Sequence, residues 1–301
     1  MAFTAQDVAK LREQTGAGMM DCKKALTHTD GDFAKAATYL REQGISVAAK
    51  KADRVASEGA VAAHISQDGK TGAVVEINCE SDFVAKNEGF LALCNDIAQH
   101  IAIHNPQDEI ALLDQKFEKD NKITVGEHIT NSIAKIGEKI TVRRLIRFQS
   151  KGAVASYIHM GGKIGVMVDV DCAKVDDKVL ELCKDIAMHI AAFAPTYLDS
   201  TQVPAAELDA EKEVFRKQAE KDGKPAQVIE KMVEGRAKKY YKDVCLLDQE
   251  FAKDGSVTVA QYIQKTNADV KVNRFVRFVT GEGIEKKVDN LAEEVAKMTK
   301  K

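Results

Sequence analysis

The sequence GKTGAVVEINC at residues 69–79 returns as GKIGVMVDVDC at residues 162–172, 93 positions later. A shorter block, residues 59–62, returns at the same distance as residues 152–155. These segments are rich in Ala, Val and Ile, as is typical of buried strands, and the Asp-Gly pair within residues 66–72 favours a tight hairpin. The chain therefore contains an internal duplication, and each copy is predicted to begin with two paired strands.

The rest of each copy adds a helix and a final strand. LCNDIA at residues 93–98 returns as LCKDIA at residues 182–187, with apolar residues continuing at helical spacing. The closing segments are VRRLIRF at residues 142–148 and VNRFVRF at residues 272–278. Each unit is predicted to be an antiparallel sheet covered by helices, which is the α+β class.

The second copy contains a long insertion. LLDQKF at residues 112–117 returns as LLDQEF at residues 246–251, 134 positions later, whereas the preceding helical blocks are only 89 apart. The extra 45 residues fall at about residues 196–240, in a charged sequence of helix-favouring residues that breaks once at residues 223–225. This pattern predicts an inserted antiparallel helical hairpin, a short coiled coil that projects from the second unit.

Both ends of the chain are predicted to be helical. Residues 1–55 contain three apolar runs at helical spacing, separated by glycine-containing turns, and indicate a compact three-helix bundle. The third helix is expected to close at Gly44, leaving residues 48–54 as a charged connector. Residues 281–301 are expected to form a last amphipathic helix.

Composition limits the class of protein. The 301 residues are 45% hydrophobic and 30% charged with a formal net charge of -2, which gives no electrostatic footprint for nucleic acid. No apolar run approaches the roughly 18 residues of a membrane span, and the N-terminus lacks the features of a secretion signal. Six cysteines without CxxC pairing indicate reduced thiols. We expect a cytoplasmic protein with no membrane or direct nucleic-acid partner.

The first copy has four residues that the second lacks, and they fall within residues 80–90. Four residues are about one helical turn, so they either lengthen the next helix or form a loop before it. Ser81 or Asp82 could cap that helix, with Phe83 and Val84 in its first turn. Two interpretations remain open: Phe83 packs beneath the helix as a hydrophobic staple, or it is displayed beside a carboxylate as an aromatic wedge.

Met19 and Met20 are a second candidate for binding. Adjacent residues of a helix cannot both face one core, so at least one methionine is expected on the surface. An exposed methionine suits an adaptable binding surface. Packing of both side chains after local distortion is the alternative.

The duplication also tests for chemistry, because a feature found in both copies belongs to the scaffold. His100 and His104 have the i, i+4 spacing of zinc ligands, but the second copy has His189 and then Phe193 at the matching positions. The nucleotide-binding and hydrolase motifs GxxxxGK[ST], GxGxxG, GxSxG and HExxH do not occur. The sequence thus gives no positive sign of catalysis, and we expect no cofactor and no metal; a zinc enzyme that uses this histidine pair is the rival interpretation.

Two longer motifs resemble a known family. TGAGMMDCKKAL at residues 15–26 and NCESDFVAKN at residues 78–87 are similar to the two signatures of bacterial elongation factor Ts. Ser81 stands where the family often has threonine, and it keeps the small hydroxyl. Further likeness covers essentially the full length, at residues 156–159, 186–189, 223–225 and 230–236.

The resemblance implies an architecture. Residues 1–55 would be a ubiquitin-associated-like (UBA-like) helical bundle. Residues 56–150 and 151–280 would be the two core units, with the inserted hairpin at about residues 196–240. Residues 281–301 would be a C-terminal module.

The resemblance also implies a function, guanine-nucleotide exchange on the GTPase elongation factor Tu. Asp82 and Phe83, flanked by Ser81 and Val84, would enter the G domain of the GTPase near its magnesium site. The aromatic ring would wedge between helices, the Mg²⁺ ion would lose its coordination, and the phosphate loop would shift.

Other contacts implied by the resemblance spread over the chain. Met19, Met20 and the C-terminal module would touch the G domain, and His159 would touch the neighbouring β domain. The helical hairpin would offer a surface for a homodimer or a 2:2 complex. A different class of function is an adaptor that binds ubiquitin-like partners through the N-terminal bundle and has no exchange activity.

Overall fold

Two three-stranded antiparallel sheets form the centre of the computed structural model, which describes residues 3–223 and 225–285. The first sheet has the order β1-β2-β5, with β1 Glu58–Ile65, β2 Thr71–Cys79 and β5 Ile140–Gln149. The second has the order β10-β7-β6, with β6 Ala153–His159, β7 Ile164–Asp171 and β10 Lys271–Val279. The repeated block supplies the central strand of each sheet, and the predicted α+β class is confirmed.

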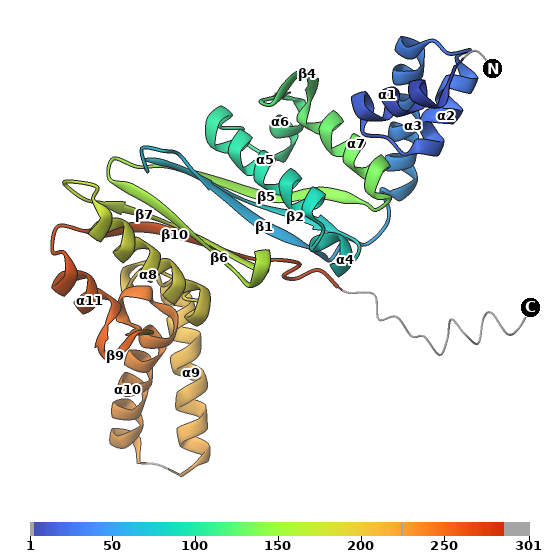
Figure 1. Cartoon of the computed structure of the whole chain (residues 1–301). Helices are drawn as coiled ribbons and strands as arrows, with labels where there is room; N and C mark the ends of the chain where they lie inside the picture. Colours follow the sequence, from blue (N-terminus) through green and yellow to red (C-terminus); the bar gives the residue numbers. More distant parts are fainter. Residues whose placement is uncertain (1–2, 224, 286–301) are drawn as a thin grey trace, which may run out of the picture.

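The two sheets pack against each other (Figure 1). Their shared core is a cluster of apolar side chains from both sheets: Val61, Val74, Phe148, Val154, Met167 and Phe278. A Cβ atom on Gly72 would lie 2.7 Å from Val154 Cγ1, and one on Gly165 would lie 2.2 Å from Val61 Cγ1. The sheets can approach this closely because both positions, which are equivalent in the repeat, lack a side chain.

Helices cover the outer face of each sheet, so the core has four layers (Figure 1). The first copy contains α5 Glu88–His104, α6 Glu109–Asp114, α7 Val125–Ile136 and a small ribbon of β3 Lys116–Phe117 with β4 Asp120–Thr124. The second copy contains α8 Asp177–Phe193, α11 Val259–Thr266 and a ribbon of β8 Glu250–Phe251 with β9 Asp254–Thr258. The predicted strand–strand–helix–strand plan of each unit is confirmed.

The inserted hairpin consists of α9 Ala205–Lys221 and α10 Ala226–Val244, which extend away from the sheets (Figure 1). The two helices pack along a small apolar seam: Phe215, Ala219, Ile229 and Val233. At its base, the Glu207 carboxylate accepts hydrogen bonds from the Tyr197 and Tyr240 hydroxyls. The predicted pair of helices is confirmed, and the phenol–carboxylate contacts tie its base to the core.

The N-terminal bundle consists of α1 Ala5–Thr15, α2 Met19–His28 and α3 Phe33–Lys51. The prediction that α3 ends at Gly44 is wrong, and residues 48–51 belong to the helix rather than to a connector. Gly44 faces α7, where Ala134 Cβ would lie 3.5 Å from an added Cβ. Packing of α3 on α7 therefore carries the helix past its glycine, a tertiary effect that overrides local propensity.

The chain after β10 turns back onto the first sheet. Thr280 N donates a hydrogen bond of 3.0 Å to Lys163 O, and Gly281 N donates one of 2.7 Å to Glu76 Oε1. Residues 281–285 are not helical, and residues 286–301 of the predicted C-terminal helix lie outside the described residues.

Candidate partner-binding surface

The four extra residues form a separate helical turn, α4 Asp82–Ala85, between β2 and α5. Eight residues, 80–87, separate Cys79 from α5, whereas four residues, 173–176, separate Cys172 from α8. The helices α5 and α8 are each 17 residues long. The extra length therefore adds a turn before the helix and does not lengthen it.

Ser81 is the N-cap of this turn, and its hydroxyl accepts a hydrogen bond of 3.3 Å from Val84 N. The prediction of a cap is correct for Ser81, but the capped element is α4. The longer helix α5 has its own cap, because Asn87 Oδ1 accepts from Gly89 N and Phe90 N. Val84 packs partly against the core and Ala85 is buried, so the turn is held on one side only.

Phe83 is 82% exposed, and the interpretation that it packs beneath the helix is therefore wrong. The buried aromatic side chain of this region is Phe90, whose exposure is 0%. Beside Phe83, Asp82 Oδ2 lies 2.7 Å from Lys86 Nζ, and this hydrogen bond lowers the pKa of Asp82. The turn thus displays a bare aromatic ring next to an ionised carboxylate.

A second exposed apolar side chain is Met160, in a short turn that contacts β1, the strand that α4 also contacts. It begins the turn after β6, has a positive φ of 49° and is 71% exposed. The turn seats on β1, because a Cβ on Gly162 would lie 2.8 Å from Ala60 Cβ, and α4 also contacts β1. Met160 is not among the residues predicted from sequence, although a large apolar residue followed directly by two glycines is a signal for an exposed turn.

His159 lies beside Met160 at the end of β6 and is half-buried. Its Nδ1 atom is 3.0 Å from the Tyr157 hydroxyl. The next charged residue, Lys163, pairs with Glu58 at the start of β1, with 2.7 Å between Nζ and Oε2. The structure therefore brings the segment around His159 close to the segment around Phe83 at one sheet end.

Met19 and Met20 begin α2 and are 44% and 63% exposed. The interpretation that both pack inward is wrong. Helix α2 of the bundle stands apart from α4 (Figure 1), so the predicted contact residues form two separate surfaces.

His100 belongs to the scaffold, because its counterpart His189 makes the same contacts. Glu118 N donates a 3.2 Å hydrogen bond to His100 Nδ1, so the proton of the neutral ring is on Nε2, which lies 2.9 Å from Gln115 Oε1. His189 repeats both contacts, with Ala252 N at 3.2 Å and Gln249 Oε1 at 2.9 Å. The zinc interpretation of His100 is wrong, because both ring nitrogens are engaged.

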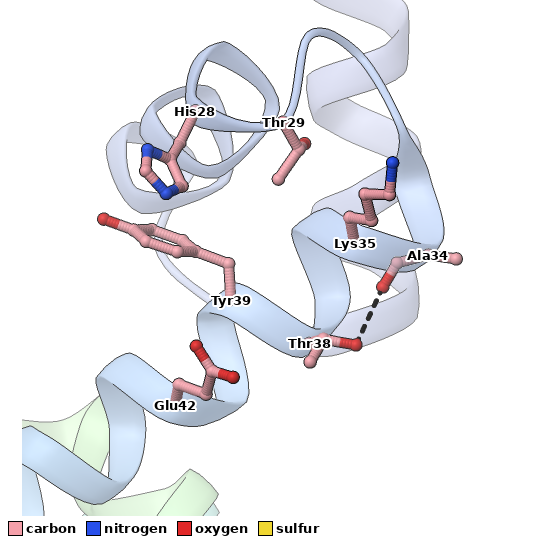
Figure 2. Close-up of a pocket in the computed structure, with 7 residues that line it drawn as sticks. All are labelled: His28, Thr29, Ala34, Lys35, Thr38, Tyr39 and Glu42. Carbon is pink, nitrogen blue, oxygen red and sulfur yellow. Dashed lines mark hydrogen bonds between the residues drawn. The ribbon is translucent and has the colours of Figure 1, made fainter.

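A hollow on the bundle lies between the end of α2 and α3 (Figure 2). The rings of His28 and Tyr39 meet across it with centroids 4.4 Å apart, and the Thr38 hydroxyl donates to Ala34 O. The hollow is lined by this pair of rings and by polar groups that do not point toward a common ligand position. Among residues 3–223 and 225–285, no three His, Cys, Asp or Glu side chains are grouped to hold a metal ion.

Comparison with known proteins identifies the family. The family model described as "Elongation factor TS" matches residues 80–282. The chain belongs to the elongation factor Ts family. Elongation factor Ts of Clostridium botulinum (strain Eklund 17B / Type B) is 49% identical over 300 residues, covering 98% of both chains. That of Clostridium perfringens (strain ATCC 13124) is 50% identical over 301 residues, covering 98% of this chain and 99% of its own.

Membership in the elongation factor Ts family places the chain in translation and protein biosynthesis. The family match begins at Glu80, so it includes α4 with its exposed Phe83. In the described part of the chain, no helix combines the length and apolar character of a membrane span.

Proposed function

We propose that the protein is a guanine-nucleotide exchange factor for elongation factor Tu. It binds the GDP form of the GTPase, dislocates its Mg²⁺ and holds the nucleotide-free state until GTP enters. The main support for this proposal is helix α4, a turn that occurs in only one copy of the repeat. It displays Phe83, which is 82% exposed, beside an ionised Asp82. The resemblance assigns this pair to the magnesium region of the G domain.

The chemistry of exchange needs binding and no covalent step, so the protein acts without an enzyme active site or a cofactor of its own. Mg²⁺ bridges nucleotide phosphates to protein oxygens, and its loss removes the largest local neutralisation of phosphate charge. A factor that binds the nucleotide-free state better weakens nucleotide binding, and by linkage the nucleotide weakens factor binding equally.

Energetics require a broad interface. A 10⁴-fold shift of the equilibrium needs about 5.5 kcal/mol of differential affinity, whereas burial of one Phe side chain supplies about 1.5–3 kcal/mol. Phe83 therefore acts together with other contacts. We assign these to Met19 and Met20 on the bundle, to the C-terminal module toward the G domain, and to His159 with the neighbouring Met160 toward the β domain.

The proposed units divide this work. Residues 1–55 and 281–301 would grip the G domain, the first core unit at 56–150 would insert α4, and the second at 151–280 would reach the β domain. The hairpin would support a homodimer or a 2:2 complex through its outer surface, where Val214 is 57% exposed. The setting of this exchange would be the cytoplasm.

The decisive experiment measures release of fluorescently labelled GDP from purified elongation factor Tu. Phe83→Ala should slow release by about 10- to 150-fold, the range that corresponds to burial of one Phe, and Asp82→Ala should also slow it. Phe193→Ala, at an exposed aromatic residue of the second copy, is the matched control. Parental rates in both α4 variants would contradict the proposal and favour the adaptor alternative, in which the bundle alone retains binding.

A further inference from the structure

The loop between α7 and β5 reaches the base of α4 through Glu138. Its Oε2 atom accepts hydrogen bonds from Glu80 N at 3.1 Å and Ser81 N at 2.9 Å. Its Oε1 atom accepts one of 2.6 Å from the Ser81 hydroxyl. Three donors from two consecutive residues therefore converge on one carboxylate, and hydrogen bonds to an ionised acceptor are stronger than those between neutral groups.

Ser81 links Glu138 to α4 through its side-chain hydroxyl. Its hydroxyl proton points to Glu138, which leaves an oxygen lone pair to accept from Val84 N at 3.3 Å. The loop is held from the other direction as well, because Lys139 N donates a 2.6 Å hydrogen bond to Glu80 Oε1. Glu80 and Ser81 are thus clamped before the first helical residue, Asp82.

The turn depends on this clamp for its orientation. α4 has four residues, and a single turn is not stable by itself because nucleation of a helix is unfavourable. Phe83 contributes little packing, since it is 82% exposed. Apart from Val84 and Ala85 on the core side, the direction in which the ring points is set by the groups that fix the start of the turn.

The repeat gives an internal control. Asn78 pairs with Thr141 in the first sheet, and the equivalent Asp171 pairs with Lys271 in the second. By the same register, the counterpart of Glu138 is Ala268, which has no carboxylate. The glutamate occurs only in the copy that has the extra turn.

We infer that Glu138 is a positioning residue for exchange: it holds the start of α4 so that Phe83 and Asp82 point at the partner. The inference rests on the proposed function of α4. Glu138 touches neither the nucleotide nor the magnesium ion in this scheme, and it acts through Ser81.

Two substitutions at Glu138 separate its geometry from its charge. Glu138→Ala removes all three acceptor contacts. Glu138→Gln keeps them in number, because the amide oxygen accepts from the two backbone N–H groups while the amide NH₂ donates to the Ser81 hydroxyl. Glu250→Ala, at an exposed glutamate of the second copy, is the matched control.

GDP release is measured as a function of factor concentration. Glu138→Ala should lower the maximal rate by about 10-fold and change the half-saturating concentration by less than about 3-fold, since the rest of the interface still supplies the grip. Glu138→Gln should recover the rate to within about 3-fold of the parent. In the Asp82→Ala/Phe83→Ala background, Glu138→Ala should add less than a 2-fold effect, because both side chains that Glu138 positions are then missing.

Hydrogen exchange in residues 80–85 supplies a readout independent of the GTPase. Glu138→Ala should speed exchange of the Ser81 and Val84 amides by about 10-fold or more while amides of α5 keep their protection. If Glu138→Ala folds poorly, Ser81→Ala replaces it; this variant keeps the two backbone contacts and should lower the maximal rate by about 3-fold.

The outcomes are distinct. A parental maximal rate in Glu138→Ala, or an equally large effect of Glu138→Ala in the Asp82→Ala/Phe83→Ala background, overturns the inference alone. A parental rate in Phe83→Ala overturns the proposed function of the turn and this inference with it. A higher half-saturating concentration of Glu138→Ala with a parental maximal rate would also overturn the inference, because Glu138 would then contribute to binding of the partner and not to the positioning of α4.

Discussion

The buried carboxylate of Glu76 accepts a hydrogen bond of 2.7 Å from the backbone N–H of Gly281, 205 residues later in the chain. The same carboxylate binds Arg143 at 3.1 Å and Arg144 at 2.6 Å. Burial alone would raise the pKa of Glu76, but the hydrogen bonds from Gly281, Asn78 and the two arginines outweigh burial and lower it. One side chain of the central strand β2 therefore fixes the place where the chain leaves the second sheet.

Glu76→Ala is expected to destabilise the fold by about 3–5 kcal/mol, because it leaves two arginines without their buried partner. The free energy of unfolding in urea measures the loss. Asp21→Ala, at the exposed ion pair with Lys24, should cost about 1 kcal/mol or less. Equal effects of the two substitutions would show that the Glu76 cluster contributes no more than a surface pair.

Phe83→Ala and Phe90→Ala form a matched pair for stability. Phe83 is 82% exposed, so its removal should change the free energy of unfolding by no more than about 0.5 kcal/mol. Phe90 is fully buried, so its removal should cost about 3–5 kcal/mol. Chemical denaturation distinguishes them, and a large loss for Phe83→Ala would mean that its ring packs inward in solution.

The stability of the fold should fall as the pH drops below about 6.5, the ordinary pKa of histidine. Burial lowers the pKa of both His100 and His189 in the folded state, and the N–H group facing each Nδ1 leaves no room for a second proton. The unfolded chain then binds protons first, so stability is complete above about pH 6.5 and is lost between that pH and the lower folded pKa values. Each histidine contributes up to about 1.4 kcal/mol per pH unit in this window.

Urea unfolding between pH 7.5 and 5.5 measures this slope. The double variant His100→Asn/His189→Asn keeps an acceptor for the Glu118 and Ala252 N–H groups but does not titrate, so its slope should be shallower. A residual slope is expected from His128, whose pKa burial also lowers. An unchanged slope in the double variant would assign the pH dependence to other groups.

Gly165→Ala should destabilise the contact between the two sheets. The new Cβ would lie 2.2 Å from Val61 Cγ1, and overpacking of this kind costs about 1–3 kcal/mol. Thermal unfolding of Gly165→Ala is compared with that of Gly255→Ala, whose Cβ meets nothing within 4 Å. Adding Val61→Ala should return part of the lost stability, and failure to do so would place the strain elsewhere.

Local sequence pattern predicted the architecture well where the signal is repeated or long. The two copies of the block at 69–79 each form a central strand, and the insertion near 196–240 forms a helical pair. The spacing of apolar residues that predicts a strand or a helix involves only neighbouring positions in the chain. These elements can therefore be predicted without knowledge of their tertiary contacts. The same comparison of copies located the extra residues at 80–90 and so drew attention to Asp82 and Phe83.

Other features depend on contacts between distant residues. Gly44 lies inside α3 because α7 packs against it, although a glycine in sequence indicates an end. The turn after β6, which carries Met160, lies against β1 through Gly162. A local sequence pattern does not show which distant residue a given side chain will contact in the folded protein.

The duplicated α+β scaffold and its one asymmetric segment can be predicted from the order of residues, because repeated blocks and extra length are visible when the two copies are aligned. Whether the side chains of that segment are buried or exposed depends on contacts with distant residues. Phe83 is exposed rather than packed, and the start of its short turn is held by the carboxylate of Glu138, 57 residues after Ser81. Hydrogen bonds of this range form only once the two segments have been brought together by the sheet.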